Sequence, residues 1–127
     1  MLILPRKINE SIFVIGPSGD FFKMKLIGAN RNYATFELNL ANGRFKPSFD
    51  VDAKGVAYLQ KGTGRWSVKH VPSGKSFDLM VDKVVSKAEG FDRLQRPSYA
   101  KIGIEDKSGV FQIYREELWD KITKGQR

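Results

Sequence analysis

Residues 1–7 read MLILPRK, with three consecutive aliphatic side chains followed by a proline and two cations. In an extended strand, Leu2 and Leu4 share one face and Ile3 lies on the other. A strand that is apolar on both faces belongs inside a sheet, and its basic end would then lie at the sheet margin. N-terminal residues usually fray unless a sheet holds them, so the neighbour of this strand decides the fold. We expect that neighbour to be residues 110–115, near the other end of the chain.

The length and composition favour one globular domain. A chain of 127 residues can bury a hydrophobic core, and 41% hydrophobic residues is ordinary for a folded protein. No run approaches the roughly 18 apolar residues that a membrane span needs, and the N-terminus lacks the order of a secretion signal. The chain has no cysteine, which excludes disulfides and thiolate zinc sites and fits a reducing compartment. We therefore expect a cytoplasmic protein that is not embedded in a membrane.

The charge balance points to an anionic partner. Lys and Arg number 22 against 14 Asp and Glu, which gives a net charge of +8. Such a balance favours nucleic acid first and an anionic membrane surface second. A net charge of this size also serves solubility alone, so the charge by itself does not identify the partner.

Alternating apolar and polar residues predict a series of short strands separated by turn-forming residues. One helix is expected at residues 116–124, because Glu116 and Glu117 suit the first turn of a helix and Gly125 suits its end. This pattern is typical of an all-β sandwich or barrel with one C-terminal helix. The further strands are expected at residues 11–15, 22–26, 33–40, 44–47, 56–59, 65–71, 76–85, 98–105 and 110–115.

An internal repeat divides the chain into two halves. The tripeptide at 17–19, Pro-Ser-Gly, recurs at 72–74, a shift of 55 residues (72 − 17), and in this frame Leu4 falls on Leu59. Tyr-Ala at 33–34 recurs at 99–100, a shift of 66 (99 − 33), and the difference is an insertion in the polar loop at 86–97. We therefore predict a single intertwined domain over residues 1–127. Its parts are repeat one at 1–49, a linker at 50–55, repeat two at 56–115 and the helix at 116–124.

Residues 2–11 read LILPRKINES, and residues 100–105 and 110–119 read AKIGIE and VFQIYREELW. The first of these segments resembles the opening, and the other two resemble the ending, of the carbon-storage-regulator (Csr/Rsm) family of bacterial RNA-binding proteins. Together they cover about a fifth of the chain. Family chains are about half as long and form intertwined dimers. The resemblance therefore implies two five-strand repeats fused as a pseudo-dimer, which would be a monomer in solution.

The resemblance also implies a binding site and its ligand. Each family site combines the first strand of one protomer with the last strand of the other, and it binds single-stranded GGA loops of messenger or small RNA, often to block ribosome access. Here the corresponding residues are those of the first and last strands: Leu4, Pro5, Arg6, Lys7, Ile113, Tyr114 and Arg115. Arg can contact phosphate or a guanine edge with paired donors, and splayed loop bases can be read on their edges. Pro5 departs from the family pattern and removes one backbone N–H.

The second such pair of strands departs from the pattern. Phe49 stands where the frame places the last-strand arginine, and Lys61 stands in place of Arg6. We therefore expect one preserved site and one degenerate site.

Other readings of the sequence stay open. Arg6, Lys7 and Arg115 could be solvated surface charges, or Arg115 could pair with a neighbouring glutamate at little energetic value. His70 is the only histidine, so we expect neither a His-based metal cluster nor a serine triad, and we predict no enzyme activity and no cofactor. The alternative function is a protein-interaction module on the same scaffold, which sequesters ordinary family members or engages a protein antagonist.

Overall fold

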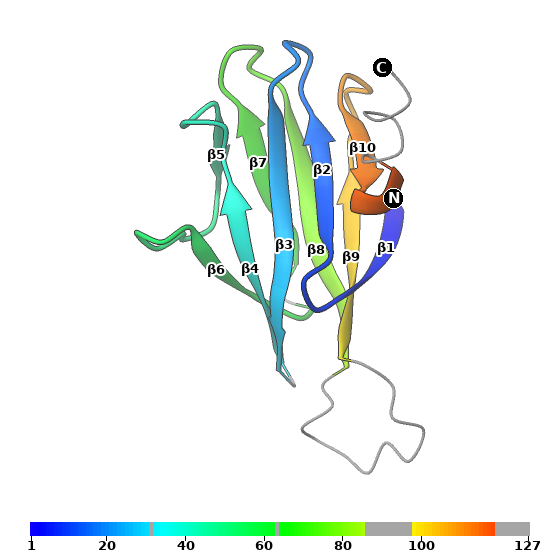
Figure 1. Ribbon diagram of the computed structural model, residues 1–127. Helices are drawn as coiled ribbons and strands as arrows, with labels where there is room; N and C mark the ends of the chain where they lie inside the picture. The colour runs from blue at the N-terminus through cyan, green and yellow to red at the C-terminus, as the bar shows by residue number, and fades with distance from the viewer. Residues whose placement is uncertain (31, 63, 86–97, 119–127) are drawn as a thin grey trace.

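The computed structural model describes residues 1–30, 32–62, 64–85 and 98–118. Within these ranges the chain forms ten strands, drawn in Figure 1. They are β1 (Leu2–Lys7), β2 (Ser11–Ile15), β3 (Phe21–Ala29), β4 (Tyr33–Asn39), β5 (Phe45–Pro47), β6 (Val56–Gln60), β7 (Trp66–His70), β8 (Ser76–Val85), β9 (Tyr99–Glu105) and β10 (Gln112–Arg115).

The strands form two antiparallel five-stranded sheets. One sheet has the order β1-β9-β8-β7-β5 and the other has the order β10-β2-β3-β4-β6. Residues 116–118 are helical, directly after β10. The prediction of an all-β fold with a short C-terminal helix is confirmed at this level. The rest of the expected helix, residues 119–124, and the polar loop at 86–97 lie outside the described residues. In the described part of the chain, no helix has the length and apolarity needed to cross a bilayer.

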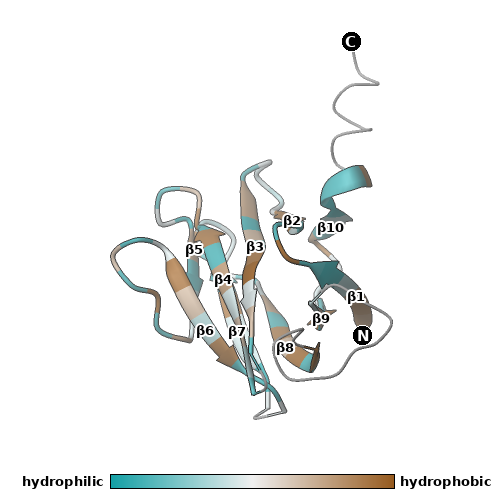
Figure 2. Ribbon diagram, turned by 60° about the horizontal axis from the view of Figure 1, so that its bottom comes forward, coloured by the Kyte–Doolittle hydropathy of each residue, from teal (hydrophilic) through white to brown (hydrophobic). Residues whose placement is uncertain are grey.

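Each sheet combines strands from both halves of the chain. The first sheet takes its three central strands, β7 to β9, from the second half and its outer strands, β1 and β5, from the first. The second sheet reverses this, with β2 to β4 in the centre and β6 and β10 outside. Figure 2, seen from another direction, places β1 and β10 at one side of the molecule and β5 and β6 at the other.

The central hairpins of the two sheets have the same register. The pairs of β3 with β4 and of β8 with β9 coincide at shifts of 55 (78 − 23) and 66 (105 − 39) residues. Both hairpins carry a β-bulge at the same place, between Leu26 and Gly28 and between Val81 and Lys83. The matching pairs are Lys23↔Asn39 and Asp78↔Glu105, Met24↔Leu38 and Leu79↔Ile104, Lys25↔Glu37 and Met80↔Gly103, Leu26↔Phe36 and Val81↔Ile102, Gly28↔Thr35 and Lys83↔Lys101, and Ala29↔Ala34 and Val84↔Ala100.

The predicted neighbour of the first strand was wrong. β1 pairs with β9, with Leu2 opposite Ile104 and Leu4 opposite Ile102. β10 pairs instead with β2. β9 has seven residues and is long enough to pair with all six residues of β1, whereas β10 has only four residues. β1 and β10 are close in space, but they belong to different sheets.

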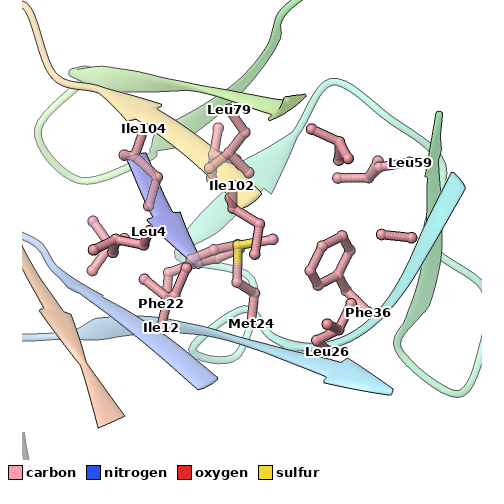
Figure 3. Close-up of a cluster of buried hydrophobic side chains, with 14 of the residues drawn as sticks. Leu4, Ile12, Phe22, Met24, Leu26, Phe36, Leu59, Leu79, Ile102 and Ile104 are labelled. Atoms are coloured by element: carbon pink, nitrogen blue, oxygen red, sulfur yellow. The ribbon is translucent and has the colours of Figure 1, made fainter. Parts of the chain in front are cut away.

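The core lies between the two sheets and is filled by the alternating apolar positions of their strands. Figure 3 shows side chains of β2 and β3 from one sheet meeting those of β1, β8 and β9 from the other. The buried residues include Leu4, Ile12, Phe22, Met24, Leu26, Phe36, Leu59, Leu79, Ile102 and Ile104. Leu4 therefore serves as a core residue at the margin of the candidate site.

Candidate nucleic-acid interface

β1 and β10 are the outermost strands of their sheets on the same side of the molecule (Figures 1 and 2). A side-chain ion pair connects β1 with the helical residues that directly follow β10. Glu117, two residues after β10, forms an ion pair with Arg6 of β1. The fold thus brings together two segments that lie more than 100 residues apart in the sequence.

Arg6 is the centre of this connection. Only 4% of its surface is exposed. Its Nη1 and Nη2 donate to Oε1 and Oε2 of Glu117 at 2.8 and 3.2 Å. Its Nε donates to the Pro5 carbonyl at 2.7 Å, and Nη1 also approaches the Ser11 carbonyl at 3.4 Å. Most of the donor capacity of the guanidinium is therefore used within the protein, so Arg6 positions the edge rather than offering an open binding group.

The two glutamates after β10 fix the start of the helix to the β1–β2 corner. The hydrogen bonds from Arg6 lower the pKa of Glu117, and the charge of Arg115 lowers it further. Glu116 accepts a hydrogen bond from the Ser11 backbone N–H at 3.2 Å. Sequence reasoning assigned these carboxylates only to the helix or to Arg115. Their position immediately after the last strand was the available signal that they could reach the first strand.

The exposed cations of this edge are Lys7 and Arg115. Lys7 ends β1 opposite Tyr99, and its backbone N–H donates to the Glu10 carboxylate. Arg115 ends β10 opposite Ile12, and its positive charge helps to lower the pKa of Glu117. These two side chains are the groups best placed to meet an anionic ligand.

The other sequence-predicted residues surround this corner. Pro5 is exposed in β1, while Leu4 points into the core. Ile113 is half-buried and packs against the core from β10, and Tyr114 is half-buried on the next position. The predicted set therefore divides into two exposed cations, one buried cation, one exposed proline and partly or fully buried supporting residues.

The strand registers show which residue of the opposite edge, formed by β5 and β6, is equivalent to Arg6. Leu59 pairs with Ala34, and Arg6 pairs with Ala100, which occupies the position equivalent to Ala34. Arg6 therefore corresponds to Leu59, and the predicted correspondence with Lys61 was wrong by two residues. The cause is that the repeat frame of 55 residues holds for β3 and β8 but not for β1 and β6. Leu59, like Arg6, is buried.

A buried polar cluster lies at the turn end of the sandwich. His70 is fully buried, and its Nε2 lies 2.9 Å from Oδ1 of Asp20 while its Nδ1 lies 2.6 Å from Oγ of Ser73. Arg44 pairs with the same aspartate at 3.3 Å. A Cβ on Gly16 would come within 2.9 Å of both Asp20 and His70, so glycine is needed there.

A serine and an aspartate meet the single histidine in this cluster, a contact that the sequence did not indicate. However, general-base catalysis requires that the base reach a substrate, and the His70 ring has no exposed surface. Asp20 follows β2 in the second sheet, and His70 ends β7 in the first. We interpret the cluster as a polar connection between the sheets.

Comparison with protein-family models, with curated proteins and with solved structures finds no match for this chain.

Proposed function

We propose that this protein is a post-transcriptional regulator that binds single-stranded GGA-type loops of messenger or small RNA at the edge formed by β1 and β10. The observation that carries the proposal is the position of these two strands, because the Csr/Rsm resemblance implies a site built from a first and a last strand. The side chains of that edge are connected through Arg6 and Glu117 at 2.8 Å. By binding such loops, the protein would block ribosome access in the cytoplasm.

The origin of this arrangement is the duplication of a five-strand unit within one chain. The shared register and the shared bulge of the two central hairpins support it. So does the exchange of outer strands between the sheets, which is the crossed arrangement that the resemblance implies for a dimer. A fused pseudo-dimer has two edges of this kind, and here only the β1–β10 edge keeps exposed cations at the positions of Lys7 and Arg115.

The chemistry of the edge suits an RNA loop. Lys7 and Arg115 are exposed and can contact phosphate or a guanine edge. Because β1 and β10 are edge strands, their outward backbone N–H and C=O groups can read unstacked bases. Leu4 and Ile113 support the strands from within, and Arg6 holds the two strands in position. The net charge of +8 adds a general attraction for a polyanion.

A protein-interaction role is the second candidate, and one observation favours it. Leu2 and Ile3 of the edge strand β1, and Met1 just before it, are exposed apolar residues. An unpaired, apolar strand edge can accept a strand from another protein. The partner in that case would be an ordinary family member or a protein antagonist.

A filter-binding titration with a short GGA hairpin separates the two candidates. Replacing Arg115 by alanine should weaken RNA binding by about 1–3 kcal/mol, as loss of a charge-assisted contact does. The matched control is Lys61→Ala, an exposed cation outside the β1–β10 edge. Affinity should also fall as salt rises, with a slope of roughly 0.7 per phosphate contact. If the hairpin does not bind, or if both variants behave alike, the protein-interaction role is favoured.

A further inference from the structure

A pocket of about 450 Å³ lies beside β5 and β6 and is lined by residues of β6, of β7 and of the segment after β5. Figure 1 shows β5 and β6 on the opposite side of the sandwich from β1 and β10. Three of its five lining residues are aromatic and one is acidic: Ser48, Phe49, Asp50, Tyr58 and Trp66. The tyrosine is 64% exposed, so the pocket opens to solvent.

The pocket has the opposite charge character from the proposed RNA edge. The ladder of β5 with β7 matches that of β10 with β2, since Pro47 faces Val68 as Ile113 faces Val14. Phe49 lies two residues after Pro47, and Arg115 lies two residues after Ile113. Phe49 is therefore the equivalent of Arg115 on this edge. The exposed cation of one edge is replaced by an aromatic ring, and no lysine or arginine is among the residues that line the pocket.

Two of the lining rings stand at a steep angle to each other. The Phe49 and Trp66 rings have centroids 6.3 Å apart and planes at 78°. The Tyr58 ring meets Tyr33, which does not line the pocket, edge to face at 5.9 Å and 71°. A flat nucleobase is best held between parallel ring faces, whereas a compact cation is attracted to the electron-rich faces of rings set at an angle to one another.

The charges around the pocket support a cationic ligand. Asp50 is exposed and contributes a carboxylate to the lining. Arg65 precedes Trp66 in the chain, but it is paired with Glu105 and lies 4.0 Å from Asp78. Its charge is therefore compensated by two carboxylates outside the pocket lining.

We propose that this pocket binds a small molecule carrying a quaternary ammonium group. The N-methyl groups contact the faces of Phe49, Tyr58 and Trp66, and Asp50 balances the positive charge. The site is independent of the proposed RNA edge, since it lies at the other margin of both sheets. The chain would thus carry two sites of opposite charge preference.

The test is an NMR titration of the full chain that follows the indole N–H signal of Trp66, with choline chloride as the probe. We expect a saturable shift with a dissociation constant on the order of a millimolar. The neutral isostere 3,3-dimethylbutan-1-ol keeps the shape and removes the charge, and it should bind at least about fivefold more weakly. Sodium chloride at equal ionic strength should give no saturable shift.

Variants assign the binding to the named groups. Tyr58→Leu removes an exposed ring and should weaken choline binding at least about threefold, whereas Tyr58→Phe should retain it. Asp50→Asn should weaken binding to a similar degree. Asp82→Asn removes an exposed carboxylate that does not line the pocket, and it should have no effect.

Three results of the choline titration would overturn the proposal. These are equal binding of the neutral isostere, absence of a saturable choline shift, and a shift that Tyr58→Leu and Asp50→Asn leave unchanged. Tighter binding of guanosine monophosphate than of choline would also overturn it and would identify a nucleobase pocket. An N-trimethyl-lysine peptide serves as the last comparison. If this peptide binds at least about tenfold more tightly than choline, the ligand of the pocket is a methylated peptide and the small-molecule proposal is wrong.

Discussion

At the scale of single residues, Arg6 links the edge to the fold. Arginine is rarely buried without a partner, and here the cost of removing its charge from water is offset by the bidentate contact with Glu117. The sequence identified Arg6 as a member of the site but could not reveal this role. A partner 111 positions away becomes visible only when the sheets are assembled.

Replacing the buried Arg6 by alanine should lower the stability of the protein more than replacing a surface cation does. We expect the free energy of unfolding to fall by about 1–3 kcal/mol, with the lower part of this range reflecting the solvent exposure of Glu117. Lys7→Ala is the matched control, because Lys7 is the next residue and is exposed. It should change stability by less than about 0.5 kcal/mol. Urea denaturation measures both, and equal effects would contradict the structural role of Arg6.

Stability should also depend on the charge of Asp20. Burial raises the pKa of its carboxyl group, but hydrogen bonds from His70 and Arg44 outweigh this and hold the pKa below its ordinary value of 3.8. A carboxyl group with a lowered pKa in the folded state stabilises the protein above its unfolded-state pKa. That stabilisation is lost as the pH falls through the lowered folded-state pKa.

The measurement is urea denaturation between pH 7 and pH 2. The wild-type chain should lose stability below about pH 4. Asp20→Asn should be less stable at neutral pH and should show a smaller loss in acid. A variant whose acid dependence equals that of the wild type would show that Asp20 does not contribute.

At the scale of elements, local sequence patterns predicted the strands but not all of their neighbours. The alternation of Phe22, Met24 and Leu26 located β3 and its buried face, and the residues after β2 and β7 located two turns. Gly19 and Gly74 have positive φ in those turns, as turn chemistry requires. Alternation does not encode which strand lies beside which. The error in the partner of β1 has this origin.

The exchange of outer strands predicts that neither half of the chain folds alone. Co-expressed fragments 1–50 and 51–127 should associate and purify together, because each sheet needs strands from both. Each fragment expressed separately should give a circular dichroism spectrum without a cooperative thermal transition. A fragment that folds independently would contradict the intertwined topology.

At the scale of the whole molecule, both copies of the outer strands are supplied by one chain. We therefore expect a monomer, and light scattering at micromolar concentration should give a mass near 14.4 kDa. A mass of twice this value would mean that the sheets recruit strands from a second chain. The pseudo-dimer account would then be wrong.

We propose one RNA site per chain, at the edge of β1 and β10. Isothermal titration calorimetry with a short GGA hairpin measures the number of sites directly. We expect one hairpin per chain, with affinity reduced by about 1–3 kcal/mol in Arg115→Ala and unchanged in Lys61→Ala. Two equivalent sites, or an Arg115→Ala variant with wild-type affinity, would contradict it.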